Sequence, residues 1–312
     1  IAKLETMRRL GNSKKGTIAQ KTKLNAQNLT GMNTMPHIAI IIPARYASTR
    51  FPGKPLAQIA GRAMLERVVF IARAAVRDLP DTEFCVATED PRIVDFCTAR
   101  DIPVVLTDDT CKTGTDRVAM AIQNLEWSPD IILGLQGDAP FTPLSAVTGV
   151  INALRTHAPA DVATPVVNLR WAELDALRAS KINTPFTGTT AIVDASGRAL
   201  WFSKNIIPAI RTEHKMRSVD PLGSAGLSPV YQHLGLYCYR AAALQKFITL
   251  PEGVYEKLEG LEQLRLIENG MYVQAVPLDI DLGLAQAGVD SPDDITRAER
   301  VIAEHGDPMG GI

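Results

Sequence analysis

Three cations follow the first strongly apolar segment of the chain, and their types and spacing suit phosphate chemistry. Ile38 to Ile42 is an apolar run of strand length, and the loop after it carries Arg45, Arg50 and Lys54 among Pro, Ala, Ser and Gly residues. In α/β proteins, phosphates bind where backbone N–H groups and fixed cations meet at the carboxyl end of the sheet. The spacing matches neither the Walker A loop nor G-x-G-x-x-G. The pattern predicts a different phosphate-binding loop, although a basic surface loop would have the same composition.

Two aspartates are candidates for binding a metal beside such phosphates. Asp138 ends the motif Gln136-Gly137-Asp138 after another apolar run, and Asp290 stands just before Ser291, the predicted N-cap of the last helix. Mg²⁺ favours one or two carboxylates together with phosphate oxygens and water, so both are predicted ligands. A tight turn also explains Asp138, and the helix dipole also explains Asp290. The metal prediction requires the two carboxylates to meet in the fold.

A third motif, Thr113-Gly114-Thr115-Asp116-Arg117, opens a predicted helix. Exposed N–H groups at a helix start, with hydroxyls and Gly alongside, can bind a base or a phosphate. Helix capping by Thr113 or Thr115 accounts for the same residues. The motif is therefore a candidate nucleotide contact with a structural alternative.

Alternating strands and helices must position these motifs. Apolar strands alternating with helices predict a mostly parallel sheet covered on both faces, so that loops after the strands share one edge. The predicted strands are 38–42, 83–88, 102–107 and 131–135, and the predicted helices are 63–76, 91–100, 115–124 and 145–156.

The pattern changes after residue 156, where strands follow one another with few helices between them. This section is predicted to be a smaller, mixed addition to the sheet, and the Gly-, Pro- and Ser-rich segment 211–229 a long loop that is either a lid or a mobile connection. The predicted strands are 162–167, 189–193, 199–203, 234–239 and 272–276, and the predicted helices are 255–268 and 292–305.

Composition limits the class of protein and its partners. The 312 residues are 46% apolar and carry a formal net charge of −1, which predicts a soluble globular protein with no nucleic-acid partner held by bulk charge. No apolar run approaches the roughly 18 residues that span a bilayer, so no membrane partner is expected. Residues 1–34 contain seven Lys or Arg and one acidic residue, and are predicted to be a flexible basic extension before Met35. Four scattered cysteines predict buried reduced thiols and a cytoplasmic location.

Together the motifs resemble one family, the CMP-KDO synthetases, also called 3-deoxy-manno-octulosonate cytidylyltransferases. Residues 43–56, PARYASTRFPGKPL, are similar to its signature loop almost residue for residue, and later motifs follow in the family's order over about residues 36–304. Those motifs are Val86-Ala87-Thr88, residues 113–117, Gln136-Gly137-Asp138, His233-Leu234-Gly235-Leu236-Tyr237, Leu261-Glu262-Gln263-Leu264-Arg265 and residues 288–294.

This resemblance implies a fold and a reaction. The fold would be a Rossmann-like, glycosyltransferase-A-like cytidylyltransferase domain over residues 35–312, with a nucleotide-binding half (35–150) and a sugar-acid-binding half (151–312). The enzyme would be a homodimer that transfers CMP from CTP to the anomeric hydroxyl of 3-deoxy-manno-octulosonate (KDO) or a KDO-like acid. Pyrophosphate would leave, Mg²⁺ would be the cofactor, and the product would serve lipopolysaccharide synthesis.

The resemblance also implies residue roles. Arg45, Lys54 and Asp138 would be catalytic, and Asp138 and Asp290 would bind the metal. Residues implied to bind the nucleotide are Ala44, Arg45, Arg50, Lys54, Thr88, Thr113, Gly114, Arg117 and Gln136. Residues implied to bind the acid are His233, Tyr237, Glu262 and Gln263.

Some positions depart from the family pattern. Ala139 stands where Glu usually follows Gln-Gly-Asp, Thr190 stands where a basic residue is typical, and Glu89 stands where Asp is common. The first two favour an alternative acceptor: amino-KDO, another nonulosonic-type sugar acid or a phosphonate. A non-catalytic nucleotide-binding homologue is a further alternative. Retention of all five charged residues argues against it: Arg45, Arg50, Lys54, Asp138 and Asp290.

Overall fold

The computed structural model describes residues 38–47, 51–219, 226–280, 282, 289 and 291–310. Two predicted site residues, Arg50 and Asp290, lie outside the described residues, as does the predicted extension 1–34.

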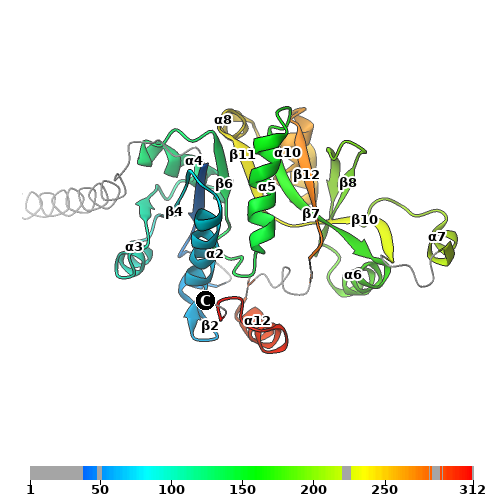
Figure 1. Ribbon diagram of the computed structural model, residues 1–312, viewed down its shortest axis with the longest axis horizontal. Helices are drawn as coiled ribbons and strands as arrows, with labels where there is room; N and C mark the ends of the chain where they lie inside the picture. Colours follow the sequence, from blue (N-terminus) through cyan, green and yellow to red (C-terminus); the bar gives the residue numbers. More distant parts are fainter. Residues whose placement is uncertain are drawn as a thin grey trace, which may run out of the picture.

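The first half of the chain forms the parallel part of a large sheet (Figure 1). Its strands lie in the order β5 (Val104–Leu106), β4 (Thr82–Thr88), β1 (Ile38–Pro43) and β6 (Ile131–Gly134), all parallel. β1 and β6 are buried along their whole length because helices cover both faces. The apolar sides of α2 (Met64–Asp78), α3 (Pro91–Thr98) and α5 (Leu144–Thr156) pack on one face, and α4 (Gly114–Leu125) packs on the other. The predicted parallel sheet is confirmed.

The second half continues the same sheet with mostly antiparallel strands. β11 (Tyr237–Arg240) pairs with β6, and the order runs on through β7 (Val162–Arg170), β10 (Leu227–His233), β8 (Thr189–Val193) and β9 (Ala199–Ser203). β12 (Val273–Leu278) pairs with β7 in parallel. The backbone N–H of Ala275 donates to Gly197 O at 2.8 Å, which connects β12 to the β8–β9 turn. The division predicted at residue 150 falls inside α5, and the sheet runs across it.

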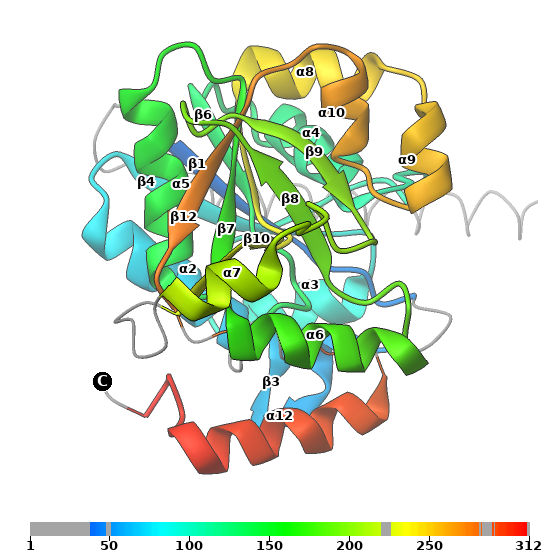
Figure 2. The same ribbon diagram turned by 90° about the vertical axis from the view of Figure 1, so that its right-hand side faces the viewer.

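Short helices and a C-terminal helix complete the covering layers. α8 (Ala241–Thr249), α9 (Val254–Glu259) and α10 (Leu264–Glu268) lie on the face that α4 covers (Figure 2). α12 (Pro292–His305) lies beside the hairpin of β2 (Gln58–Ile59) and β3 (Arg62–Ala63). α12 begins at the predicted Ser291 cap, whose N–H donates to Asp294 at 2.9 Å.

Several elements differ from the sequence prediction, which also lacked α8 and the β2–β3 hairpin. α6 (Trp171–Asn183) was not predicted, because among its side chains only Leu174 is fully buried and the apolar stripe that marks a helix is weak. The predicted loop 211–229 contains α7 (Glu213–Val219) and the start of β10. The predicted helix 255–268 is two helices, because Gly260 adopts a φ of 63° and ends α9.

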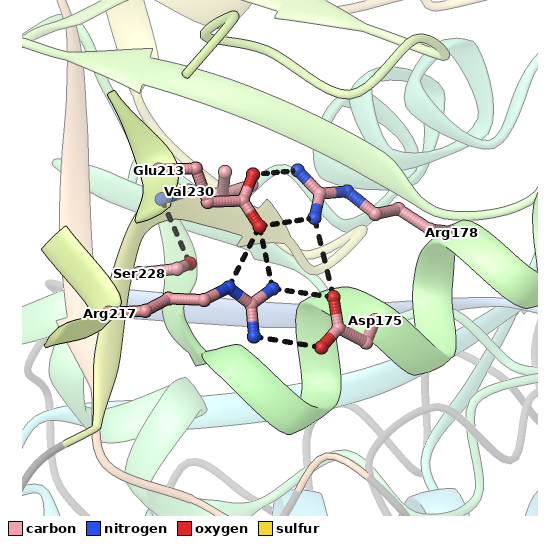
Figure 3. A network of polar contacts seen from close by, with 6 residues as sticks. All are labelled: Asp175, Arg178, Glu213, Arg217, Ser228 and Val230. Carbon is pink, nitrogen blue, oxygen red and sulfur yellow. Dashed lines mark hydrogen bonds and ion pairs between the residues drawn. The ribbon is translucent and has the colours of Figure 1, made fainter. Parts of the chain in front are cut away.

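Alternating charges join α7 to α6 (Figure 3). Glu213 accepts from Arg178 and Arg217 at 2.7 Å, and Arg217 also donates to Asp175 at 2.7 Å. The two guanidinium groups lower the pKa of Glu213 to about 2. This contact surface is made by ion pairs at the protein surface, not by a shared apolar core.

All four cysteines are buried and unbridged, as predicted. Within the described residues, no helix is long and apolar enough to cross a membrane.

Candidate active site

The loop after β1 returns Lys54 to the end of that strand. Ala44 is buried and its N–H donates to Ala87 O at 2.9 Å, which fixes the start of the loop. The Gly53 N–H donates to Tyr46 O at 3.0 Å and closes it. Gly53 has a φ of 74°, and a Cβ there would lie 3.0 Å from the Tyr46 hydroxyl, so only glycine fits easily. Lys54 follows at the first position of the short helix η1 (Lys54–Leu56).

Lys54 meets Asp138, which arrives from the end of β6. Lys54 Nζ lies 2.7 Å from Asp138 Oδ2, with 11% of the lysine side chain and 44% of the aspartate side chain exposed. The loops after β1 and β6 lie so close together that only glycine fits at position 137. A Cβ at Gly137 would lie 2.6 Å from Pro43 O. Two predicted catalytic residues, distant in sequence, thus form an ion pair that solvent reaches from the aspartate side.

Arg45 and the motif at residues 113–117 border this ion pair. Arg45 is exposed, and its guanidinium donates to Lys112 O at 3.4 Å. Thr113 is the N-cap of α4, since its hydroxyl accepts from Asp116 N at 3.1 Å. A Cβ at Gly114 would lie 3.3 Å from Gln136 Oε1, so the Gln136 amide packs on the start of α4. The described structure therefore gathers these predicted nucleotide contacts at neighbouring strand ends.

Thr88 and Arg117 are fully buried, whereas a side chain that contacts a ligand needs some access to the site. The buried Thr88 hydroxyl accepts from Asp90 N at 3.2 Å. Arg117 is fully buried, donates to Thr107 Oγ1 at 2.5 Å and lies 2.8 Å from Glu89, a charge contact without hydrogen-bond alignment. In this structure these residues connect the ends of β4 and β5 to α4, and Glu89 is the counterion of Arg117. Their direct contact with a nucleotide stays a prediction.

The predicted acid-binding residues form a second cluster, in which His233 and Gln263 are buried and Tyr237 and Glu262 are half-buried. His233 ends β10, and its ring centroid lies 4.9 Å from that of Phe202 and 5.5 Å from that of Tyr237. Burial, together with the charge of Lys204, lowers the pKa of His233 to about 3. Burial, with Tyr239 and Glu262 nearby, raises the pKa of Tyr237. Both side chains are therefore neutral near pH 7.

Glu262 connects this cluster to the nucleotide motif. Its Oε1 accepts from the Thr115 hydroxyl at 2.5 Å, and burial raises the pKa of the Glu262 carboxyl. Gln263 is buried beside it. Thr115 and Glu262 come from distant parts of the chain, so their hydrogen bond brings the α4 start and the approach to α10 together.

Lys204 is a candidate that the sequence prediction missed. It follows β9, its backbone N–H donates to Glu259 at 2.8 Å, and burial lowers the pKa of its partly buried ammonium group. Thr190, where the resemblance implies a basic residue, is buried. Its hydroxyl donates to Asn205 O at 2.7 Å and accepts from Ile207 N at 3.1 Å. Lys204 therefore supplies a cation close to the position that Thr190 leaves uncharged. The sequence signal that could have identified Lys204 is its position directly after a predicted strand, a feature that it shares with Arg45.

The described carboxylates suit a hard cation shared with a ligand. No group of three or more His, Cys, Asp or Glu side chains with metal-binding geometry occurs in the described ranges. A closed zinc site needs about four protein ligands, whereas Mg²⁺ accepts one or two carboxylates and takes the rest from phosphates and water. Asp138, partly exposed beside Lys54, fits the second pattern.

Comparisons with known proteins identify the family of the chain. A family model described as Cytidylyltransferase matches residues 39–276. The chain is 40% identical over 271 residues to a 3-deoxy-manno-octulosonate cytidylyltransferase of Maricaulis maris (86% of this chain, 98% of the relative). It is 35% identical over 266 residues to the protein of that name from Elusimicrobium minutum (84% and 97%). A solved structure of CMP:2-keto-3-deoxy-manno-octonic acid synthetase complexed with CTP superimposes with a TM-score of 0.72 at 29% identity (86% and 99%). The chain belongs to the 3-deoxy-manno-octulosonate cytidylyltransferase family.

Proposed function

We propose that this protein transfers CMP from CTP to the anomeric hydroxyl of KDO or a KDO-like acid and releases pyrophosphate, as a step toward lipopolysaccharide precursors. The observation that carries the proposal is the meeting of two unlike clusters at one sheet edge. Tyr237 pairs with Gly134 at the end of β6, and Gln136 and Asp138 follow Gly134 directly. A charged cluster suited to a triphosphate therefore adjoins a neutral, polar cluster suited to a sugar.

In the proposed reaction, the chain's own residues position and stabilise charge. The anomeric oxygen forms a bond to the α-phosphorus, the bond from that phosphorus to the bridging oxygen breaks, and the hydroxyl proton is released. Negative charge develops on the α-phosphate and on the departing pyrophosphate, and Arg45 and Lys54 would stabilise it. Gln136 and the N–H groups at the start of α4 would orient the nucleotide.

Mg²⁺ is the proposed cofactor, held by Asp138 and Asp290. When bound, it would neutralise triphosphate charge and lower the pKa of the attacking hydroxyl. Lys54, which is paired with Asp138 in this structure, would turn toward the phosphates. Asp138 would then have the bound cation as its positively charged neighbour. The pair thus holds the Asp138 carboxylate in place before substrates arrive.

The acid would be bound by the second cluster. Lys204 would pair with the substrate carboxylate, Tyr237 would donate to an oxygen, and Glu262 and Gln263 would contact hydroxyls. A pocket of buried polar groups rejects acids that leave those groups unpaired. The position of Lys204 supports its proposed pairing with the substrate carboxylate. Its charge is close enough to His233 to lower the pKa of the imidazole.

A second candidate keeps the chemistry and changes the acid. Ala139 removes a carboxylate beside Asp138, and it is only partly buried. An acceptor with an extra group, such as amino-KDO or another nonulosonic-type acid, would have room there.

We also propose that the enzyme is a cytoplasmic homodimer. Four buried, unbridged thiols support a reducing compartment. Sedimentation equilibrium gives the mass directly, and a purely monomeric protein at assay concentration would overturn the dimer.

Pyrophosphate release from CTP, with Mg²⁺ and one acid at a time, tests the function. KDO, amino-KDO, a sialic acid and a phosphonate form the panel, and the preferred acid should have the highest kcat/KM. Release with amino-KDO but not KDO would select the second candidate. Release with none of them would refute the proposed activity.

A further inference from the structure

The hydroxyl of Thr164 lies between the His233 ring and a backbone carbonyl. Thr164 Oγ1 is 2.7 Å from His233 Nε2 and 2.8 Å from Leu236 O, and Thr164 and His233 are both buried. A hydroxyl has one proton, and a carbonyl oxygen can only accept. The Thr164 proton therefore goes to Leu236 O, and the Thr164 oxygen accepts from His233 Nε2–H.

This arrangement leaves the other ring nitrogen, Nδ1, available. Among the described residues, only Thr164 makes a hydrogen bond to the His233 ring. The His233 residue is 8% exposed, so it is not completely sealed from solvent. The Phe202 and Tyr237 rings restrict rotation of the imidazole.

We propose that Thr164 is a positioning residue that holds His233 as the neutral Nε2–H tautomer. Nδ1 of His233 then accepts a hydrogen bond from a hydroxyl of the acceptor acid, an assignment that rests on the proposed function. The tautomer of a histidine is set by the partner of its other nitrogen. His233 thus selects for a hydroxyl donor and does not serve as a cation for the carboxylate.

The charges around the ring favour the neutral form. Lys204 faces His233 from the end of β9, and the neighbouring Tyr237 on β11 stays protonated because burial raises its pKa. A second positive charge on the imidazole would repel Lys204. Lys204 remains the group suited to the carboxylate.

Histidine-selective ¹⁵N labelling of the full chain tests the tautomer without requiring turnover. The chain has five histidines, and the signal missing in His233→Gln assigns His233. Long-range ¹H–¹⁵N spectra between pH 6 and 8 should show a protonated Nε2 and an unprotonated Nδ1. The Nδ1 signal should move when CTP and the preferred acid bind. A protonated Nδ1 in the free protein, or an unchanged Nδ1 signal with a bound acid, would overturn the proposal.

Substitutions test the positioning role. Thr164→Val keeps the shape and removes the hydroxyl, so a mixture of tautomers and about a tenfold higher KM for the acid are expected, with KM for CTP unchanged. Thr164→Ser should restore both, which a merely structural role of the methyl group would not. Thr156→Val is the control, because its exposed hydroxyl donates only to the backbone carbonyls of Asn152 and Ala153 within α5. An unaltered tautomer in Thr164→Val would refute the role of Thr164. A correct tautomer in a protein that accepts no acid would support this assignment and refute the proposed reaction.

Discussion

The two clusters at the sheet edge use opposite kinds of polar group. The nucleotide side presents charges on loops: Arg45 is exposed, and Asp138 is 44% exposed within its pair with Lys54. The acid side presents buried or half-buried groups, His233, Tyr237 and Glu262, whose pKa shifts all favour the neutral form. A triphosphate needs charge compensation, whereas a sugar needs matched donors and acceptors. The difference predicts that substitutions on the two sides will change different kinetic constants.

Asp138→Ala should have the largest effect. Loss of the proposed metal ligand and of the Lys54 partner should lower kcat on the order of 10³-fold or more, with the fold intact. Pyrophosphate release measures the rate, and circular dichroism measures the fold. Glu304→Ala, an exposed carboxylate on α12, is the matched control. Turnover of Asp138→Ala close to that of the parent protein would refute the metal assignment.

Lys204→Ala should affect only the acid side. Removing the cation should raise KM for the acid roughly 10- to 100-fold, because a charge-assisted hydrogen bond contributes about 1.5–3 kcal/mol. KM for CTP should stay unchanged. Lys246→Ala, an exposed lysine on α8, is the control. An equal rise in both KM values would show that the two clusters are not separate in function.

The buried His233 should make stability depend on pH. Its pKa is about 3 in the folded protein and 6.5 as the ordinary value, so between these pH values the unfolded state binds more protons. Stability should therefore fall as the pH drops below 6.5, with a slope approaching ~1.4 kcal/mol per pH unit from this group. Urea unfolding of parent and His233→Gln from pH 7 to 5 measures the difference. The charged neighbours Lys204, Glu259 and Glu262 are present in both proteins, so their contributions cancel in the comparison. Parallel pH curves would contradict a neutral His233.

The α6–α7 ion pairs should matter least. Glu213→Ala removes the carboxylate shared by Arg178 and Arg217, yet surface ion pairs contribute little to stability. Both KM values and kcat should stay at the parent values, and the thermal midpoint should change little. A marked rise in KM for the acid would connect α7 to the acid cluster and change the comparison.

The same contrast explains what could be predicted from the sequence. The parallel half was predictable because each of its strands is a continuous apolar run. The charged residues of that half stand out in the loops, because buried strands contain few charges. Lys54 and Asp138 could therefore be placed at one edge before any coordinates. The acid cluster was found by family resemblance only, since a buried histidine or glutamate has no periodic signal. Thr164 and Lys204 were missed because their roles depend on strands β7, β9 and β10 meeting in space. α6 was missed because it buries so little.

Product analysis by ³¹P NMR tests the central claim most directly. CTP, Mg²⁺ and the preferred sugar acid, incubated with the full-length protein, should give equal amounts of pyrophosphate and a CMP phosphodiester of the acid. Neither product should form when the acid is omitted. Release of orthophosphate or CMP without the phosphodiester, or no change in CTP with any acid of the panel, would contradict the account.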